Sequence, residues 1–235
     1  MQRNRKPLFV LFMGLFLTLC TAPHIAQAQD RFADAVLRYE PLFTGGPAPS
    51  AVNQNSLQAL GAPGGGFVSL GRGGLLELAF LNNLLTNSAT NAADLYIYEI
   101  GPDIEDTFVA IRPTGTTFTL LGPSFDTNGD GFLEIGKVFG STSTIDIDAI
   151  FPGFAAGTLQ FNAVQLIDDR LEGNSTGVSV GADIDALEAL TSVPVVTGPI
   201  PVPEPSEWLA MGMAGTSVLG LMIRARRRKN SPAAA

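Results

Sequence analysis

Short apolar runs, separated by turn residues, limit the folds open to this chain more than any other feature of its sequence. Each run is rich in apolar, β-branched and aromatic residues, and alternation with polar residues is clearest at residues 95–100 and 144–148. Turns rich in Gly, Pro, Asn and Asp separate the runs, as at residues 101–103 and 128–131. The nine runs cover residues 66–70, 75–81, 95–100, 107–111, 117–121, 134–139, 144–150, 158–167 and 177–180.

No long amphipathic helical pattern lies between these runs. Strands of this number and spacing predict a mainly β chain, folded as an antiparallel β-sandwich of the jelly-roll type. Two segments stay open between a helical turn and a strand, residues 34–39 and 186–190. Residues 41–63 are rich in Gly, Pro, Ala and Asn, which predicts a long surface loop or a partly disordered stretch.

The N-terminus has the pattern of a secretory signal peptide. Basic residues near the start precede an apolar run at residues 8–19, and the small residues Ala26 and Ala28 follow as a cleavage site. We therefore expect residues 1–28 to be a signal peptide that is cleaved after Ala28. The rest of the chain is then exported through the inner membrane.

The only cysteine, Cys20, and the only histidine, His24, both lie in this signal peptide. The mature chain would then have neither residue, which excludes disulfides, thiolate nucleophiles, Ser-His-Asp triads and zinc sites built from His or Cys. Its stability must come from an apolar core, from metal ions held by oxygen ligands or from assembly.

The region between the two ends of the chain is strongly acidic. Residues 29–200 contain twenty acidic side chains and only six basic ones. Nucleic-acid binding is disfavoured, because phosphate contacts need clustered Lys and Arg. Cations are the natural partners of such a surface, although an acidic exterior can also serve solubility alone.

The C-terminus combines a short proline motif, an apolar stretch and a basic end. In order, these parts are Pro203, Glu204, Pro205 and Ser206, then the uncharged residues 208–223, then a basic cluster with Arg226, Arg227 and Arg228. As a helix the apolar stretch would be about 24 Å long, slightly short of a hydrocarbon core of about 30 Å. Because basic residues stay on the cytoplasmic side, we expect a transmembrane helix and basic tail at residues 207–229 and a cytoplasmic end at 230–235.

This order of parts resembles the PEP-CTERM sorting signal of Gram-negative bacteria. In that family an exosortase, a membrane-embedded enzyme similar to cysteine transpeptidases, reads the signal and processes the chain near the motif. The resemblance implies a transient stay in the inner membrane, then a place in the cell envelope or on the extracellular surface. It also implies that the exosortase recognises Glu204. The alternative is an ordinary C-terminal anchor on a proline-rich stalk.

The length between the two ends allows one domain. We assign residues 29–65 to an N-terminal extension and surface loop, residues 66–195 to the β-sandwich, and residues 196–206 to a proline-rich linker that contains the sorting motif.

Four segments of the sandwich resemble a recurrent exported jelly-roll domain of bacteria. They are VSLG with GLLEL at residues 68–78, DLYIYE at 94–99, TFTLLG at 117–122 and GADIDAL at 181–187. The middle two resemble consecutive strands of that family, and the last resembles its closing motif. Such domains are similar to galactose-binding-like and carbohydrate-binding sandwiches, which implies a sugar-binding or adhesive role. A shared fold does not by itself assign a function.

The segment from Asp126 to Glu134 has the spacing of a calcium-binding loop. Gly131 stands at the position of the sharp turn, whereas Lys137 stands where an EF-hand has a bidentate Glu. We expect a weak Ca²⁺ site between strands, and the alternative is a bare turn rich in Asx residues. The expected oxygen ligands are Asp126, Asn128, Asp130, the carbonyl of Phe132 and Glu134.

A second Ca²⁺ site is expected from Asp183 and Asp185. Residues two apart on a strand project to one face, as do Asp146 and Asp148. In sandwiches of the resembling type, a structural calcium joins the last strand to an early loop. The resemblance thus implies a joint site of Asp183 or Asp185 with Asn82, Asn83 or Asp94, and the alternative is that these strand carboxylates simply face solvent.

These patterns favour a non-catalytic protein of the cell surface or the exopolysaccharide matrix. One alternative is a calcium-stabilised carbohydrate-binding module, which the small number of aromatic residues disfavours. Another is a glycosidase that works with carboxylates alone, for which Glu77, Glu99 and Glu134 are the candidates. No pair of carboxylates stands out in the sequence as a catalytic pair.

Overall fold

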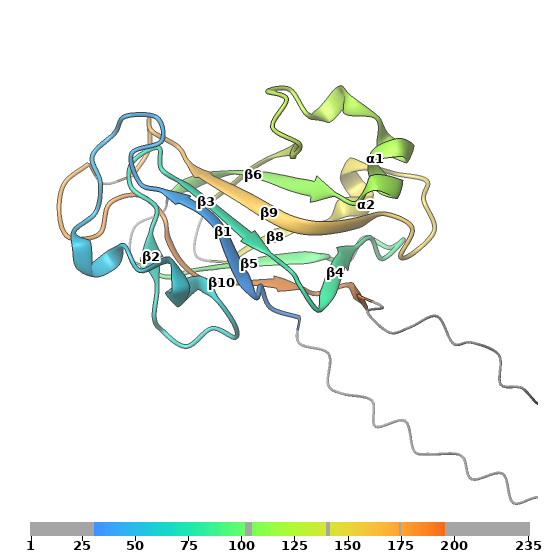
Figure 1. The fold of residues 1–235 in the computed structure, drawn as a ribbon, viewed down its shortest axis with the longest axis horizontal. Coiled ribbons are helices and arrows are strands. Elements are labelled where there is room, and N and C mark those ends of the chain that lie inside the picture. Colours follow the sequence, from blue (N-terminus) through green and yellow to red (C-terminus); the bar gives the residue numbers. More distant parts are fainter. Residues whose placement is uncertain (1–30, 102–104, 140–141, 174, 196–235) are drawn as a thin grey trace, which may run out of the picture.

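Most of the described chain is β-structure, arranged in two antiparallel sheets with little helix (Figure 1). This computed structural model describes residues 31–101, 105–139, 142–173 and 175–195. Two short helices, α1 (Gly115–Leu121) and α2 (Ile147–Ile150), accompany 3₁₀ turns at Ala51–Asn53, Ser56–Ala59 and Pro123–Phe125. The strands are β1 (Ala35–Glu40), β2 (Val68–Ser69), β3 (Leu75–Ala79), β4 (Asn83–Thr86), β5 (Leu95–Glu99), β6 (Asp106–Pro113), β7 (Leu133–Phe139), β8 (Thr142–Ile145), β9 (Gln160–Asp168), β10 (Asp183–Ala189) and β11 (Ser192–Pro194).

The larger sheet is built around β9. This strand pairs with β3 and β4, and also with β6, always antiparallel. Beyond these strands, β1 pairs with β3, β11 with β4, and β7 with β6. Leu78, Val164 and Ile111 are register partners on β3, β9 and β6, and all three are fully buried. Apolar positions on neighbouring strands thus share one face of the sheet.

The smaller sheet has the strand order β2-β10-β5-β8. Its strand β5 shows why the sequence alternates: Leu95 and Ile97 are buried, whereas Tyr96 and Tyr98 on the opposite face are partly exposed. The two tyrosine rings pack edge to face, with centroids 4.1 Å apart. The face that carries Leu95 and Ile97 is therefore apolar and packs into a core.

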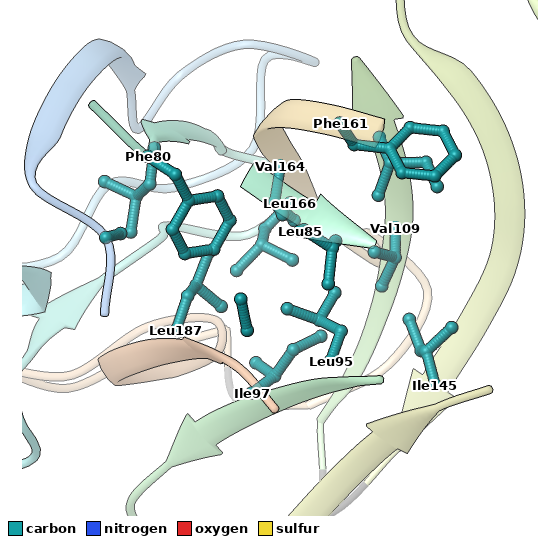
Figure 2. Close-up of a cluster of buried hydrophobic side chains, with 14 of the residues drawn as sticks. Phe80, Leu85, Leu95, Ile97, Val109, Ile145, Phe161, Val164, Leu166 and Leu187 are labelled. Carbon is teal, nitrogen blue, oxygen red and sulfur yellow. The ribbon is translucent and has the colours of Figure 1, made fainter. Parts of the chain in front are cut away.

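The core lies between the two sheets. Figure 2 shows Leu95 and Ile97 of the smaller sheet in one cluster with Val164 and Leu166 of the larger sheet. Each fully buried apolar side chain of this size stabilises the fold by about 1.5–3 kcal/mol relative to an exposed one. The antiparallel, mainly β architecture predicted from the sequence is confirmed, and its two layers share this core.

A second, small apolar cluster covers part of the outer face of the larger sheet. Phe132 packs there against Ala79, Ala110 and Ala163. Phe132 precedes β7, and its ring is 4 % exposed. The loop before β7 is therefore anchored on the sheet by this ring.

One expected strand is a helix. Residues 117–121 were predicted as β from their Thr, Phe and Leu content, but they belong to α1. Gly122, with φ of 71°, ends this helix, and its amide donates to the Phe118 carbonyl at 2.8 Å. The prediction was wrong because tertiary contacts override β propensity here: Thr117 is fully buried, and its hydroxyl accepts the Gln160 amide at 2.7 Å.

The expected strand at residues 144–150 is also shorter than predicted. It ends at Ile145, because Asp146 caps α2: its Oδ1 accepts the amides of Asp148 and Ala149 at 2.9 and 3.1 Å. Asp146 and Asp148 therefore do not alternate along a strand. The run at residues 177–180 forms no strand either, although the Val180 carbonyl accepts the Gly71 amide.

The folded region begins well before residue 66. The open segment at residues 34–39 lies largely in β1, which pairs with β3, so part of the extension assigned to residues 29–65 is a strand of the larger sheet. The open segment at 186–190 lies largely in β10. Strands β4 and β11 were not expected. Residues 41–63 contain two 3₁₀ turns, and the Ser50 amide donates to the Val178 carbonyl at 3.0 Å.

The expected signal peptide, with Ala26 and Ala28, lies outside the described residues, and so do the sorting motif and the transmembrane helix. Within the described ranges, no helix has the length and apolar character needed to cross a membrane.

Candidate calcium-binding loop and buried carboxylates

The loop from Asp126 to Phe132 folds around the carboxylate of Asp126. Asp126 Oδ1 accepts the amides of Gly129 and Asp130 at 2.7 and 3.1 Å, and Oδ2 accepts the Gly131 amide at 3.1 Å. Gly131 has φ of 87°, a conformation that other residues rarely adopt, so the sharp turn expected at this position is confirmed. The loop thus has a defined shape with a carboxylate at its centre.

Three of the five expected loop ligands come together as carboxylates. Asp126, Asp130 and Glu134 each contribute one oxygen to a group whose members all lie within 4.8 Å of one another. Glu134 Oε2 accepts the Thr127 amide at 2.8 Å, whereas its Oε1 is buried and has no hydrogen-bond partner among the described residues. Oxygen atoms on a common Ca²⁺ ion, each about 2.3–2.6 Å from it, span similar distances. This group could hold a metal ion.

The other two expected ligands have different surroundings. The Asn128 side-chain amide donates to Asp130 Oδ2 at 3.2 Å, so this side chain touches the acidic group. The Phe132 amide donates to Asp130 Oδ1 at 2.9 Å. Lys137, which replaces the final EF-hand ligand, lies 2.5 Å from both Asp106 and Asp169. These two carboxylates hold its ammonium group and raise its pKa, so Lys137 does not neutralise the loop directly.

A row of residues, polar except for Ala110, crosses the outer face of the larger sheet beside the loop. Glu77, Gln165, Ala110 and Glu134 are successive register partners on β3, β9, β6 and β7. The Gln165 side-chain amide donates to Glu77 at 3.1 Å and to Asp130 at 2.9 Å. The acidic loop is thereby tied to the sheet.

An open groove of about 400 Å³ lies on the same face. Its walls are mostly apolar, with Phe108 and Ile167 among the lining residues, and its polar rim includes Asn128, Gln165 and Lys137. Lys137 lies over the Phe108 ring, 5.3 Å from its centroid. The groove thus combines an exposed aromatic ring with hydrogen-bonding groups.

The joint site expected at Asp183 and Asp185 does not form. Asp183 accepts hydrogen bonds from the Ser69 and Ser179 hydroxyls, whereas Asp185 accepts the amides of Gly64 and Gly65. The register between β10 and β5 shifts between Ile184 and Ala186. This irregularity breaks the simple alternation on which the expectation of a shared face depended.

The early-loop partners expected for that site are also elsewhere. Asp94 directly precedes Leu95, which pairs with Ala189 at the end of β10, whereas Asp183 begins β10. Asn82 donates to Asp34 at 2.9 Å, and Asn83 is fully buried. Asp183 and Asp94 therefore do not form a joint site, because the register places them at opposite ends of β10.

Instead, Asp94 joins Asp146 and Asp148 in a second acidic group. Each contributes one oxygen to a set lying within 4.8 Å, and this group could also hold a metal ion. Asp94 is fully buried, and burial raises its pKa. The negative charge of the nearby Asp148 raises this pKa further, whereas the Thr191 and Ser88 hydroxyls and the Ile147 amide lower it in part. Sequence reasoning missed this group, although the Asp-x-Asp spacing of a helix N-cap was visible at residues 146–148.

Two further carboxylates are buried near the start of β10. Burial raises the pKa of Glu99 to about 8, and the negative charges of Glu105, Asp183, Asp168 and Asp106 add to the rise. Burial also raises the pKa of Asp168 to about 6, against the effect of two amides that its carboxylate accepts. Of the three carboxylates considered for a glycosidase, Glu99 lies on the smaller sheet, and Glu77 and Glu134 are three strands apart on the larger one.

Comparison of the chain with protein-family models, with curated proteins and with solved structures gives no match.

Proposed function

We propose that the protein is an exported, non-catalytic component of the cell surface or exopolysaccharide matrix, with a jelly-roll domain stabilised by Ca²⁺. The observation that carries this proposal is the loop group of Asp126, Asp130 and Glu134, with the buried Oε1 of Glu134 unpartnered. A polar atom that is buried without a partner costs about 1–3 kcal/mol, and a bound cation removes that cost. Carboxylate oxygens are the ligands that Ca²⁺ prefers.

The sequence of the two ends supports export and sorting. The signal-peptide pattern that ends at Ala28 directs the chain across the inner membrane. The motif Pro203, Glu204 and Pro205, followed by an apolar stretch and a basic tail, makes the chain a substrate of an exosortase. The mature domain then resides in the envelope or on the surface, where millimolar Ca²⁺ suits a weak site.

The chemistry of the mature chain supports a non-catalytic role. After cleavage at Ala28 it has no His or Cys, so any catalysis would have to use carboxylates. A glycosidase needs two carboxyl groups about 5–10 Å apart, one on each side of the substrate bond. Glu77 and Glu134 lie on strands whose backbones are three spacings apart, about 14 Å. Each carboxylate is engaged by a neighbouring donor, the Gln165 side-chain amide for Glu77 and the Thr127 amide for Glu134.

A carbohydrate-binding module is the second candidate, and the groove beside the loop favours it. Phe108 is 46 % exposed and lines this groove with Asn128 and Gln165. An exposed ring flanked by amides is the usual way to stack on and hydrogen-bond a sugar. Saturable binding on a glycan array, lost in a Phe108→Ala variant, would favour the module over a purely structural component.

The calcium proposal is tested on the full-length chain in mild detergent. With a dissociation constant of about 0.1–1 mM, 10 mM Ca²⁺ raises the melting temperature by about 3–10 °C for each site. The loop-silenced variant, Asp130→Asn with Glu134→Gln, should lose one such increment. It keeps Asp126, whose carboxylate accepts three amides and shapes the loop.

The matched control is Glu172→Gln, which removes an exposed acidic charge away from the loop. It should leave the Ca²⁺ increment unchanged, and NaCl at equal ionic strength should not reproduce the increment. An increment of the same size in the wild type and the loop-silenced variant would rule out the loop as a calcium site.

A further inference from the structure

We infer that Asp94, Asp146 and Asp148 form a second Ca²⁺ site, separate from the loop at Asp126. Their oxygens lie within 4.8 Å of one another, although Asp94 is more than 50 residues from the other two in the chain. The proposal does not depend on the loop site, because the two groups share no residue.

The strongest argument is the state of Asp94. Its side chain is fully buried, and its Oδ2 accepts the Ile147 amide at 3.0 Å. Its Oδ1 has no hydrogen-bond partner among the described residues. A fully buried carboxylate oxygen without a donor is rare, and it marks a place where a ligand is expected.

The charge around Asp94 also favours a cation. None of the ion pairs found in the described ranges involves Asp94, Asp146 or Asp148. The six basic side chains of those ranges are all engaged elsewhere, with other acids, with carbonyls or with Asn162. Three ionised carboxylates this close together, one of them buried, repel one another strongly, and a cation between them removes this repulsion without protonation of Asp94.

The two partners of Asp94 are held in place by their own hydrogen bonds. Asp148 Oδ1 accepts the Asn87 side-chain amide at 2.9 Å, and its Oδ2 accepts the Ala89 amide at 2.7 Å. Asp146 Oδ1 accepts the amides of Asp148 and Ala149 and so caps α2. The carboxylates are thus positioned before an ion binds, and the unpartnered Oδ1 of Asp94 is free to ligate it.

The location gives such an ion a structural role. Asp94 precedes β5 of the smaller sheet, and Asp146 and Asp148 lie at the start of α2, which follows β8 of the same sheet. Asn87 and Ala89 follow β4 of the larger sheet. An ion at this point fastens the two sheets together at one end of the sandwich. Hard carboxylate oxygens, completed by water, suit Ca²⁺.

The test uses the full-length loop-silenced variant, Asp130→Asn with Glu134→Gln, as background. In this background, 10 mM Ca²⁺ should still raise the melting temperature by about 3–10 °C relative to EDTA. Adding Asp146→Asn should abolish that increment, because Asn retains the helix cap but removes a ligand charge. Adding Glu172→Gln to the same background should leave the increment unchanged.

Asp94→Asn provides a second, independent measurement. Asn keeps an acceptor for the Ile147 amide and removes the buried charge, so the melting temperature in EDTA should rise. The Ca²⁺ increment should nevertheless disappear. If the loop-silenced background shows no increment, or if Asp146→Asn and Asp94→Asn leave it unchanged, the inference is overturned. The loop proposal would stand in that case, because it rests on the difference between the wild type and the loop-silenced variant.

Discussion

Glu99 is a carboxyl group that burial keeps protonated at neutral pH. Its side chain is 6 % exposed, and this burial raises its pKa. The negative charges of four other carboxyl groups add to the rise, so its pKa is about 8. The ordinary value is 4.5, and the folded protein therefore binds a proton more readily than the unfolded chain between about pH 4.5 and 8. The same holds for Asp168, whose pKa rises from 3.8 to about 6.

These two groups predict that stability falls as pH rises. A raised pKa in the folded state contributes stability that is complete below the unfolded pKa and is lost as pH increases through the folded pKa. We expect Glu99→Gln to raise the free energy of unfolding at pH 8 by on the order of 1–3 kcal/mol relative to wild type, and to change it little at pH 5. Urea unfolding of both proteins at the two pH values measures the difference, with Glu172→Gln as control. Equal pH dependence in Glu99→Gln and wild type would contradict the argument.

At the scale of the elements, the sequence was informative where one face of a strand is polar. Alternation at residues 95–100 located β5, and the apolar runs located β3, β6, β7 and β9 to within a few residues. It failed for β4 and β11, which are short and contain Asn or Pro, and for α1, whose residues favour strands in isolation. Periodicity reports burial on one face, and β4 and β11 have too few residues to show it.

Thr117 shows what holds α1 in place. Its buried hydroxyl accepts the Gln160 amide at 2.7 Å and so links the helix to the start of β9. Thr117→Val keeps the shape of the side chain but leaves that amide without its acceptor. We expect a loss of about 1–3 kcal/mol in the free energy of unfolding, measured by urea denaturation.

The neighbouring Thr116 gives a matched control for this change. It is exposed, so Thr116→Val should change stability by no more than about 0.5 kcal/mol. If the two valine variants have the same stability, the hydrogen bond to β9 does not hold the helix.

At the scale of the whole molecule, the two ends of the described chain lie on the same side of the domain (Figure 1). The Arg31 carbonyl accepts the Ala189 amide, and the Val195 amide donates to the Asn82 carbonyl. A sorting tail that follows residue 195 would hold the domain by this side. The loops around residues 45–50 and 178 lie toward the other end of the domain (Figure 1).

The sorting proposal predicts the behaviour of one residue in that tail. Glu204→Ala should prevent exosortase recognition, so that the protein keeps its tail and stays in the inner membrane. Mass spectrometry of the C-terminal peptide, together with cell fractionation, measures this. Glu207→Ala, which changes a glutamate just outside the motif, is the matched control and should be processed normally. Normal processing and surface delivery of Glu204→Ala would contradict the proposal.

The sequence by itself determined the mainly β architecture, the burial of alternating residues and the loop at Asp126, because these depend on residues close together in the chain. The tertiary structure decided which distant carboxylates meet. The antiparallel pairing of β5 with β10 puts Asp94 and Asp183 at opposite ends of β10. The pairing of β5 with β8, with Leu95 opposite Ile145, brings Asp94 to Asp146 and Asp148. Local pattern does not encode such distances, because a shift of one residue in strand pairing redirects every side chain that follows it.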